Sequence, residues 1–120
     1  MSTPESKMKW AINSVLANYK GYVYTHMPVP TGYGVSTLDY LGFCCGHGFA
    51  IEAKRPRGKP TPRQQGVIER MEAAGARVFV INGPETLADL DQWLATTVHE
   101  NQDALDQRLE ATNSHYRSGA

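Results

Sequence analysis

The middle of the sequence has the pattern of a strand, a basic loop, a helix and a second strand, an order that is typical of the α/β class. Residues 48–54 have the apolar alternation of a strand. Thr61 is a typical helix N-cap, Pro62 suits the first helical position, and Gly75 is a typical helix end. Residues 76–81 form a short apolar run, typical of a strand buried on both faces. This order predicts a sheet that is covered by at least one helix.

The N-terminal segment predicts an amphipathic helix. Ser2, Thr3 and Pro4 are helix-start signals, and Gly21 is a stop signal. Glu5 falls one turn before the first apolar residue, so we expect it on the inward face, where it could reach a site or could cap the helix by bonding Ser2. The apolar residues recur at helical spacing and form one stripe: Met8, Ile12, Val15, Leu16 and Tyr19.

Two more strands and a third helix complete the pattern. Residues 22–29 and 37–45 are rich in β-branched and aromatic residues, which favours strands. Gly46 and Gly48 suit a hairpin turn between the latter segment and the strand that follows it. Residues 85–98 have the apolar spacing of a helix. The element order α-β-β-β-α-β-α therefore predicts the α/β class, with a mixed β-sheet flanked by helices.

The chain length of 120 residues suits one domain. We expect this domain to span residues 1–98, followed by a polar arm or tail over residues 99–120, in which Leu105 and Leu109 could line a marginal helix. No apolar run approaches the roughly 20 residues of a membrane span. The polar N-terminus lacks the apolar core of a secretory signal, so a cytoplasmic location without membrane attachment is the expectation.

The formal net charge is zero, but the charges are unevenly distributed. Residues 1–84 contain 10 Lys and Arg and 5 Asp and Glu, whereas residues 85–120 contain 2 and 7. A basic first part points to an anionic partner.

The two cysteines do not predict a disulfide scaffold. Cys44 and Cys45 are adjacent, and neighbouring cysteines seldom bridge each other. Cys45 and His47 have the chemistry of half a zinc site, but no second pair stands at zinc spacing. We interpret both cysteines as small apolar residues at a strand end.

Two carboxylates and a lysine stand at the ends of two expected strands. Strand alternation places Glu52 and Lys54 on the same face. Asp39 lies in the neighbouring strand, although Asp is depleted in strands and a buried carboxylate needs a partner. If Asp39 and Glu52 meet, two carboxylates converge with one lysine between them.

Such a pair of carboxylates predicts a divalent cation, because like charges repel unless a proton or a cation lies between them. Mg²⁺ is the natural ion for oxygen ligands, and Mn²⁺ is a possible substitute. Lys54 could hold the attacking water or the developing charge. The loop that follows could hold flanking phosphates through four cationic residues: Arg55, Arg57, Lys59 and Arg63.

Each feature alone has a structural explanation. A Glu-x-Lys sequence is usually an exposed ion pair, a single strand Asp is usually structural, and a basic loop is usually a solvated surface. Their combination in hairpin order, followed by a capped helix, favours a functional site.

These residues resemble the PD-(D/E)XK nuclease superfamily, through Asp39, a hairpin, Glu52-Ala53-Lys54 and then "KPTPRQ" before a helix. Within it, the chain is most similar to VRR-NUC domains, including small standalone phage and bacterial forms, and to archaeal-type Holliday junction resolvases. The resemblance covers roughly residues 5–81. The chain departs from the pattern at Leu38, where the family often has a proline.

The resemblance implies a restriction-endonuclease-like fold and a role for each matching residue. Asp39 and Glu52 would be metal ligands, with the Ala53 carbonyl as a further one. Lys54 would be the catalytic lysine.

Two further positions follow from the same resemblance. Gln64 matches the glutamine that begins the following helix and faces the site in VRR-NUC domains, with Gln65 as the weaker candidate. Glu5 matches the glutamate of the first helix that reaches the metal site in related nucleases.

The resemblance thus implies a Mg²⁺-dependent DNA endonuclease that leaves a 5′-phosphate, with branched DNA such as a four-way junction as a candidate substrate. Junction cutting needs two active sites and therefore a homodimer. The alternative is a DNA-binding module of the same fold that does not cut. A metabolic enzyme is disfavoured, because the sequence has no glycine-rich phosphate loop and no dinucleotide fingerprint, so no nucleotide cofactor is expected.

Overall fold

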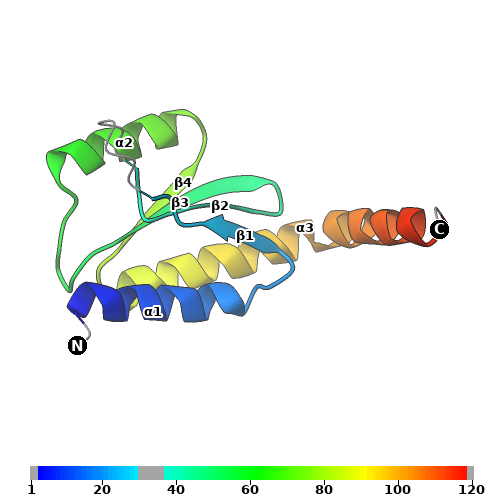
Figure 1. Cartoon of the computed structure of the whole chain (residues 1–120), viewed down its shortest axis with the longest axis horizontal. Coiled ribbons are helices and arrows are strands. Elements are labelled where there is room, and N and C mark those ends of the chain that lie inside the picture. The colour runs from blue at the N-terminus through cyan, green and yellow to red at the C-terminus, as the bar shows by residue number, and fades with distance from the viewer. Residues whose placement is uncertain (1–2, 30–36, 119–120) are drawn as a thin grey trace.

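The computed structural model of the chain describes residues 3–29 and 37–118, with side chains at all of these positions except residues 105 and 113–118. The structure contains three helices and four strands in these residues (Figure 1). In chain order they are α1 (Pro4–Ala17), β1 (Val23–His26), β2 (Tyr40–Cys44), β3 (His47–Ala53), α2 (Pro62–Ala73), β4 (Arg77–Ile81) and α3 (Pro84–Ser118).

The four strands form one mixed sheet in the order β1-β2-β3-β4. The pairs β1–β2 and β2–β3 are antiparallel, and β3 pairs with β4 in parallel after the α2 crossover. The sequence expectation of a mixed α/β sheet is therefore confirmed. Because β2 and β3 run in opposite directions, the start of β2 lies beside the end of β3, with Tyr40 opposite Ile51.

Helices cover both faces of the sheet, with α2 on one face and α1 and α3 on the other (Figure 1). On the α1 and α3 face, Phe49 and Phe79 both contact Trp93 of α3 with ring centroids 5.6 Å apart. The α2 face has a smaller core, whose buried members are Leu38, Ala50, Val67 and Ile68. Strand β4 contributes to both cores, as its apolar sequence predicts: Phe79 and Ile81 on one face, Val78 and Val80 on the other.

The β2–β3 hairpin turn has two residues, Cys45 and Gly46, with φ values of 52° and 86°. Two positive φ values in a two-residue loop match the twist of the flanking strands, and glycine adopts them without steric cost. The turn predicted at Gly46 is therefore confirmed. Cys44 is buried in the larger core and Cys45 is half-buried, with both thiols free.

Several element bounds differ from expectation. Strand β1 has four residues within the expected range 22–29, and β2 begins at Tyr40, so Asp39 precedes the strand. The third helix does not end at Val98 but runs for 35 residues to Ser118. The sequence contains no Gly or Pro between Pro84 and Gly119, so nothing terminates the helix locally.

The C-terminal half of α3 extends beyond the sheet and lengthens the molecule, which measures 50 × 32 × 31 Å (Figure 1). The described side chains at residues 102–112 are exposed. Across residues 3–29 and 37–118, no helix combines the length and hydrophobicity that crossing a membrane would require.

Candidate active site

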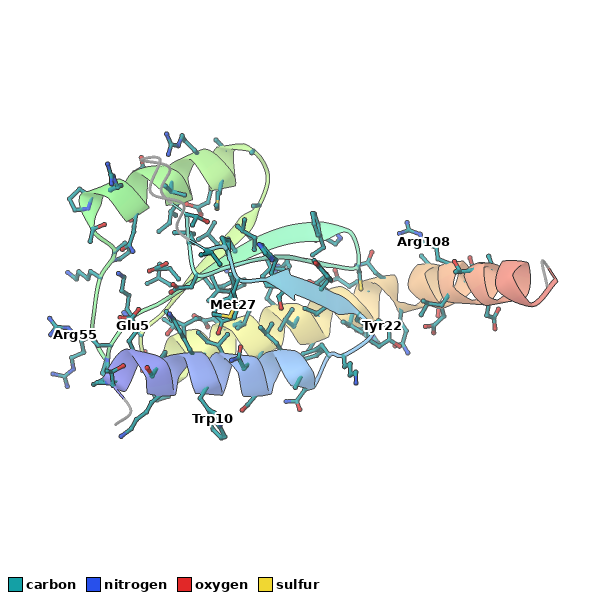
Figure 2. The ribbon with its side chains drawn as sticks, in the orientation of Figure 1. Glu5, Trp10, Tyr22, Met27, Arg55 and Arg108 are labelled. Atoms are coloured by element: carbon teal, nitrogen blue, oxygen red, sulfur yellow. The ribbon has the colours of Figure 1, made fainter. Side chains whose placement is uncertain are left out.

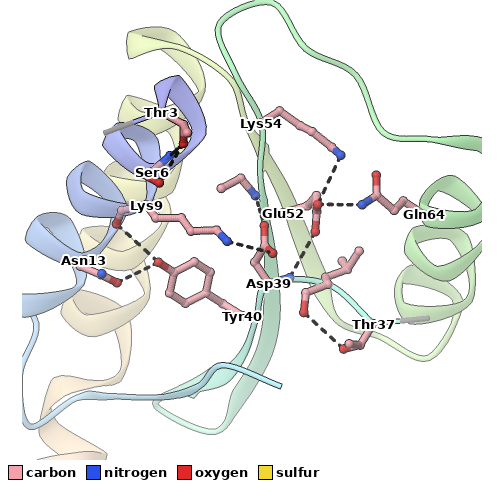
Figure 3. Close-up of polar contacts among 12 residues, drawn as sticks. Thr3, Ser6, Lys9, Asn13, Thr37, Asp39, Tyr40, Glu52, Lys54 and Gln64 are labelled. Carbon is pink, nitrogen blue, oxygen red and sulfur yellow. Dashed lines mark hydrogen bonds and ion pairs between the residues drawn. The ribbon is translucent and has the colours of Figure 1, made fainter. Parts of the chain in front are cut away.

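The structure brings Asp39 and Glu52 together where β2 begins and β3 ends (Figure 3). The Asp39 backbone N–H donates to Glu52 Oε1 at 3.2 Å. In return, the Ala53 backbone N–H donates to Asp39 Oδ2 at 2.8 Å. These reciprocal bonds hold the two carboxylates side by side, as the hairpin order predicts.

Glu52 is almost completely buried, with 4% of its side chain exposed. Burial and, to a lesser extent, the nearby Asp39 carboxylate raise the pKa of Glu52 to about 7, although Lys54 acts in the opposite direction. Lys54 Nζ lies 3.5 Å from Glu52 Oε2. Lys54 therefore pairs with Glu52 rather than lying between the two carboxylates, which corrects the arrangement expected from the sequence.

Gln64 joins the site through the start of α2. Its Nε2 donates to Glu52 Oε2 at 2.9 Å, while its Oε1 accepts from the Thr61 backbone N–H at 3.0 Å. The Gln64 backbone N–H donates to Thr61 Oγ1 at 3.2 Å, which completes a capping box. The helix cap thus fixes the orientation of the Gln64 amide, and Gln65 is exposed.

A second lysine, which the sequence reasoning missed, occupies the other side of the site. Lys9 Nζ from α1 lies 3.6 Å from Asp39 Oδ1 (Figure 3). Lys9 follows Glu5 by one helical turn and precedes Ile12 by three residues, so it borders the apolar stripe. This spacing is the signal that could have indicated it.

Tyr40 fixes α1 against the sheet next to Asp39. Its side chain is buried, and its hydroxyl donates to Asn13 Oδ1 at 2.9 Å and approaches the Lys9 carbonyl oxygen at 3.4 Å. Desolvation of this hydroxyl by burial raises its pKa. This buried hydrogen bond holds the turn of α1 that carries Lys9, and nothing in the sequence singled it out.

The expectation that Glu5 faces inward is wrong, because Glu5 is exposed at the N-terminal end of α1 (Figure 2). The cap of α1 is Thr3, whose Oγ1 accepts from the Ser6 backbone N–H at 3.0 Å. Ser2, the cap partner expected for Glu5, lies outside the described residues. Glu5 lies in the first turn of α1, one turn before Lys9, and its side chain reaches solvent rather than the carboxylate pair.

The basic loop is firmly attached to the protein at its centre. Asn82, which follows β4, accepts from the Arg57 backbone N–H at 3.1 Å and donates from Nδ2 to the Gly58 carbonyl oxygen at 2.9 Å. A Cβ atom at Gly58 would lie 2.9 Å from the Arg55 carbonyl oxygen, so a side chain there would displace the loop. The four cationic side chains predicted to bind phosphate all remain exposed beside the site: Arg55, Arg57, Lys59 and Arg63.

The comparisons with known proteins add no relative to this picture. No family model matches this chain, and no curated protein or solved structure matches it significantly. The resemblance to PD-(D/E)XK nucleases therefore rests on the residues of the sequence alone.

The oxygen atoms at the site are suited to a hard divalent cation. Among the described residues, no three His, Cys, Asp or Glu side chains gather into a metal-binding cluster, so the donor set here has two carboxylates. Because the N–H and C=O of a strand residue point to the same side, the Ala53 carbonyl is directed toward Asp39 as well. Mg²⁺ in proteins commonly has one or two carboxylate ligands and retains several waters, which this donor set can satisfy.

Proposed function

We propose that the chain is a metal-dependent endonuclease that hydrolyses phosphodiester bonds in DNA. The observation that supports this most directly is the pair of adjoining carboxylates, Asp39 and Glu52, with Lys54 and Gln64 bonded to the buried member of the pair. Burying Glu52 beside a second carboxylate is unfavourable, and a divalent cation bound to both carboxylates would offset that cost.

Asp39, Glu52 and the Ala53 carbonyl would hold the cation. When bound, Mg²⁺ would neutralise charge on the phosphoryl oxygens and lower the pKa of water. Because burial raises the pKa of Glu52 to about 7, a cation would compete with a proton for this carboxylate, and its binding would tighten as the pH rises through that value.

Lys54 would direct the attacking water and stabilise the charge that develops on the phosphoryl group. Its ammonium group lies 3.5 Å from Glu52 Oε2, and 15% of the Lys54 side chain is exposed, compared with 4% for Glu52. Gln64 would orient Glu52 through its amide, because the capping box leaves that amide one direction in which to donate.

The exposed cations of the loop would hold the phosphates on either side of the scissile bond: Arg55, Arg57, Lys59 and Arg63. The Asn82 contacts fix this loop relative to β4, and hence relative to the carboxylates. By resemblance to junction resolvases, the preferred substrate would be branched DNA such as a four-way junction, cut by a homodimer with two active sites.

The test is cleavage of supercoiled plasmid, linear duplex and a synthetic four-way junction, each with Mg²⁺, Mn²⁺ or chelator. We expect metal-dependent cutting that is lost in Glu52→Gln and Lys54→Ala and retained in Glu72→Gln, an exposed control on α2. The preferred substrate would identify the kind of nuclease. If the protein binds DNA but does not cut it with any metal, the nuclease proposal fails. The function would then be that of a DNA-binding module.

A further inference from the structure

Lys9 is held in place at the candidate site by the fold itself. Its ammonium group lies 3.6 Å from Asp39 Oδ1, and 34% of its side chain is exposed. The helical turn that carries it is fixed by Tyr40, whose hydroxyl contacts both the Lys9 carbonyl and Asn13. Lys9 therefore contacts the carboxylate on one side and solvent on the other.

The two lysines neutralise the two carboxylates pairwise. Lys9 pairs with Asp39, and Lys54 pairs with Glu52. A divalent cation between the carboxylates would be a positive charge close to both ammonium groups, and like charges at that distance repel. Lys9 is the more exposed of the two lysines, so it can move into solvent at lower cost.

From this geometry we infer that the Lys9 ammonium group is a stand-in cation: it occupies the place of a cation beside Asp39 until a divalent metal ion displaces it. The displaced ammonium group then binds a phosphate of DNA. The inference rests on the proposed function and deepens it, because it assigns Lys9 a part in both metal and substrate binding. The charge count explains the sequence of events. With both carboxylates ionised, the four groups sum to zero without a cation, whereas with one bound the same site carries a net positive charge that attracts a phosphodiester.

The first measurement is the affinity of the protein for Mn²⁺ in the absence of DNA, monitored through the electron paramagnetic resonance signal of the free ion. Lys9→Met keeps the length of the side chain and removes its charge, so we expect it to bind Mn²⁺ about threefold to fivefold more tightly than the wild type, the range set by a partly exposed ion pair. Lys9→Arg should bind as the wild type does. Lys7→Met removes an exposed charge from the same helix and is the matched control, for which we expect no change.

The second measurement is binding of a labelled duplex at saturating Ca²⁺, a cation that also takes carboxylate oxygens, with the DNA checked for integrity. Lys9→Met should bind DNA about threefold to fivefold more weakly than the wild type, although its affinity for the metal ion is higher. A simple structural role for Lys9 would not change the two affinities in opposite directions.

Unchanged Mn²⁺ affinity in Lys9→Met would overturn the stand-in role, and unchanged DNA affinity would overturn the phosphate contact. Asp39→Asn separates these failures from failure of the proposed function. If Asp39→Asn and the wild type bind Mn²⁺ equally, the metal site itself is wrong. If Asp39→Asn weakens Mn²⁺ binding and Lys9→Met leaves it unchanged, the metal site stands and the inference about Lys9 alone fails.

Discussion

Glu52 meets two opposing requirements, a buried side chain and a negative charge. Burial and the nearby Asp39 raise its pKa to about 7, from the ordinary value of 4.5 for a glutamate. Between these two pH values the folded protein retains a proton that the unfolded chain releases. The folded state therefore loses stability as the pH rises, and the loss is complete above the folded pKa.

This shift predicts how the metal-free protein responds to pH. In chelator, we expect the free energy of unfolding to fall between pH 4.5 and about pH 7.5 by on the order of 3 kcal/mol from this group. Glu52→Gln should remove most of that fall, because a neutral amide has no proton to lose. Urea unfolding at several pH values measures both profiles.

The exposed Glu72→Gln on α2 is the control and should keep the wild-type profile. A wild-type protein whose stability is flat over this range would contradict the burial argument. Saturating Mg²⁺ should reduce the fall, since a cation bound to the ionised carboxylates favours the charged form.

The sequence predicted the meeting of Asp39 and Glu52 because hairpin pairing and strand alternation are local rules. It did not predict the Lys9 contact, because that depends on the angle at which α1 crosses the sheet. The packing of Ile12 and Leu16 and the Tyr40 hydrogen bonds set this angle, and no local pattern encodes it. The prediction that Glu5 faces inward fails for the same reason.

At the scale of elements, the start of α2 connects helix stability to the candidate site. The capping box satisfies backbone N–H groups at the helix start and also orients the Gln64 amide toward Glu52. A single threonine therefore contributes both to folding and to the position of a site residue.

Thr61→Ala should accordingly change two properties. Loss of the cap should lower the free energy of unfolding by about 1 kcal/mol. Metal-dependent cleavage should fall as well, by more than the stability loss explains at a temperature where both proteins are folded. Urea unfolding and initial cleavage rates measure the two effects.

Thr61→Ser retains the hydroxyl and should restore both stability and cleavage. Gln64→Glu separates the effect on stability from the effect on cleavage. A glutamate also closes a capping box, but its carboxylate cannot donate to Glu52. A Gln64→Glu protein that is stable and fully active would rule out the role of the amide.

Helix α3 illustrates what an apolar pattern can and cannot predict about an element. The pattern ends near Val98, and among the described side chains of α3 this is the last that packs on the larger core. The helix itself continues, because its polar residues are good helix formers without a breaker. Strand β1 shows the reverse case: its β-branched run is longer than the four residues that pair with β2.

At the scale of the whole molecule, the extended part of α3 should contribute little to folding. A chain that ends after Asn101 keeps the buried Leu90, Leu94 and Thr97, and the side chains described at residues 102–104 and 106–112, which it loses, are exposed. We expect its free energy of unfolding to change by less than about 1 kcal/mol. A larger loss, or a lower oligomeric mass by light scattering, would indicate that this arm packs on a partner.

The distribution of charge gives the last prediction. Arg55 lies at one end of the molecule, and Arg108 lies far from it on the extended part of α3 (Figure 2). The basic loop adjoins the carboxylates. If each of the four loop cations meets one phosphate, the logarithm of DNA affinity should fall against the logarithm of salt with a slope of about −4. Fluorescence anisotropy of a labelled duplex over a salt series measures this slope.

The double variant Arg57→Gln with Lys59→Gln should reduce the magnitude of the slope by about 2, whichever DNA sequence is used, since phosphate contacts carry no sequence information. Lys20→Gln with Arg108→Gln removes the same charge from exposed positions outside the loop and should leave the slope unchanged. Equal slopes for the two double variants would show that net charge, and not the loop, attracts DNA. The basic loop beside Glu52 would then lose its part in placing a phosphodiester over the carboxylates.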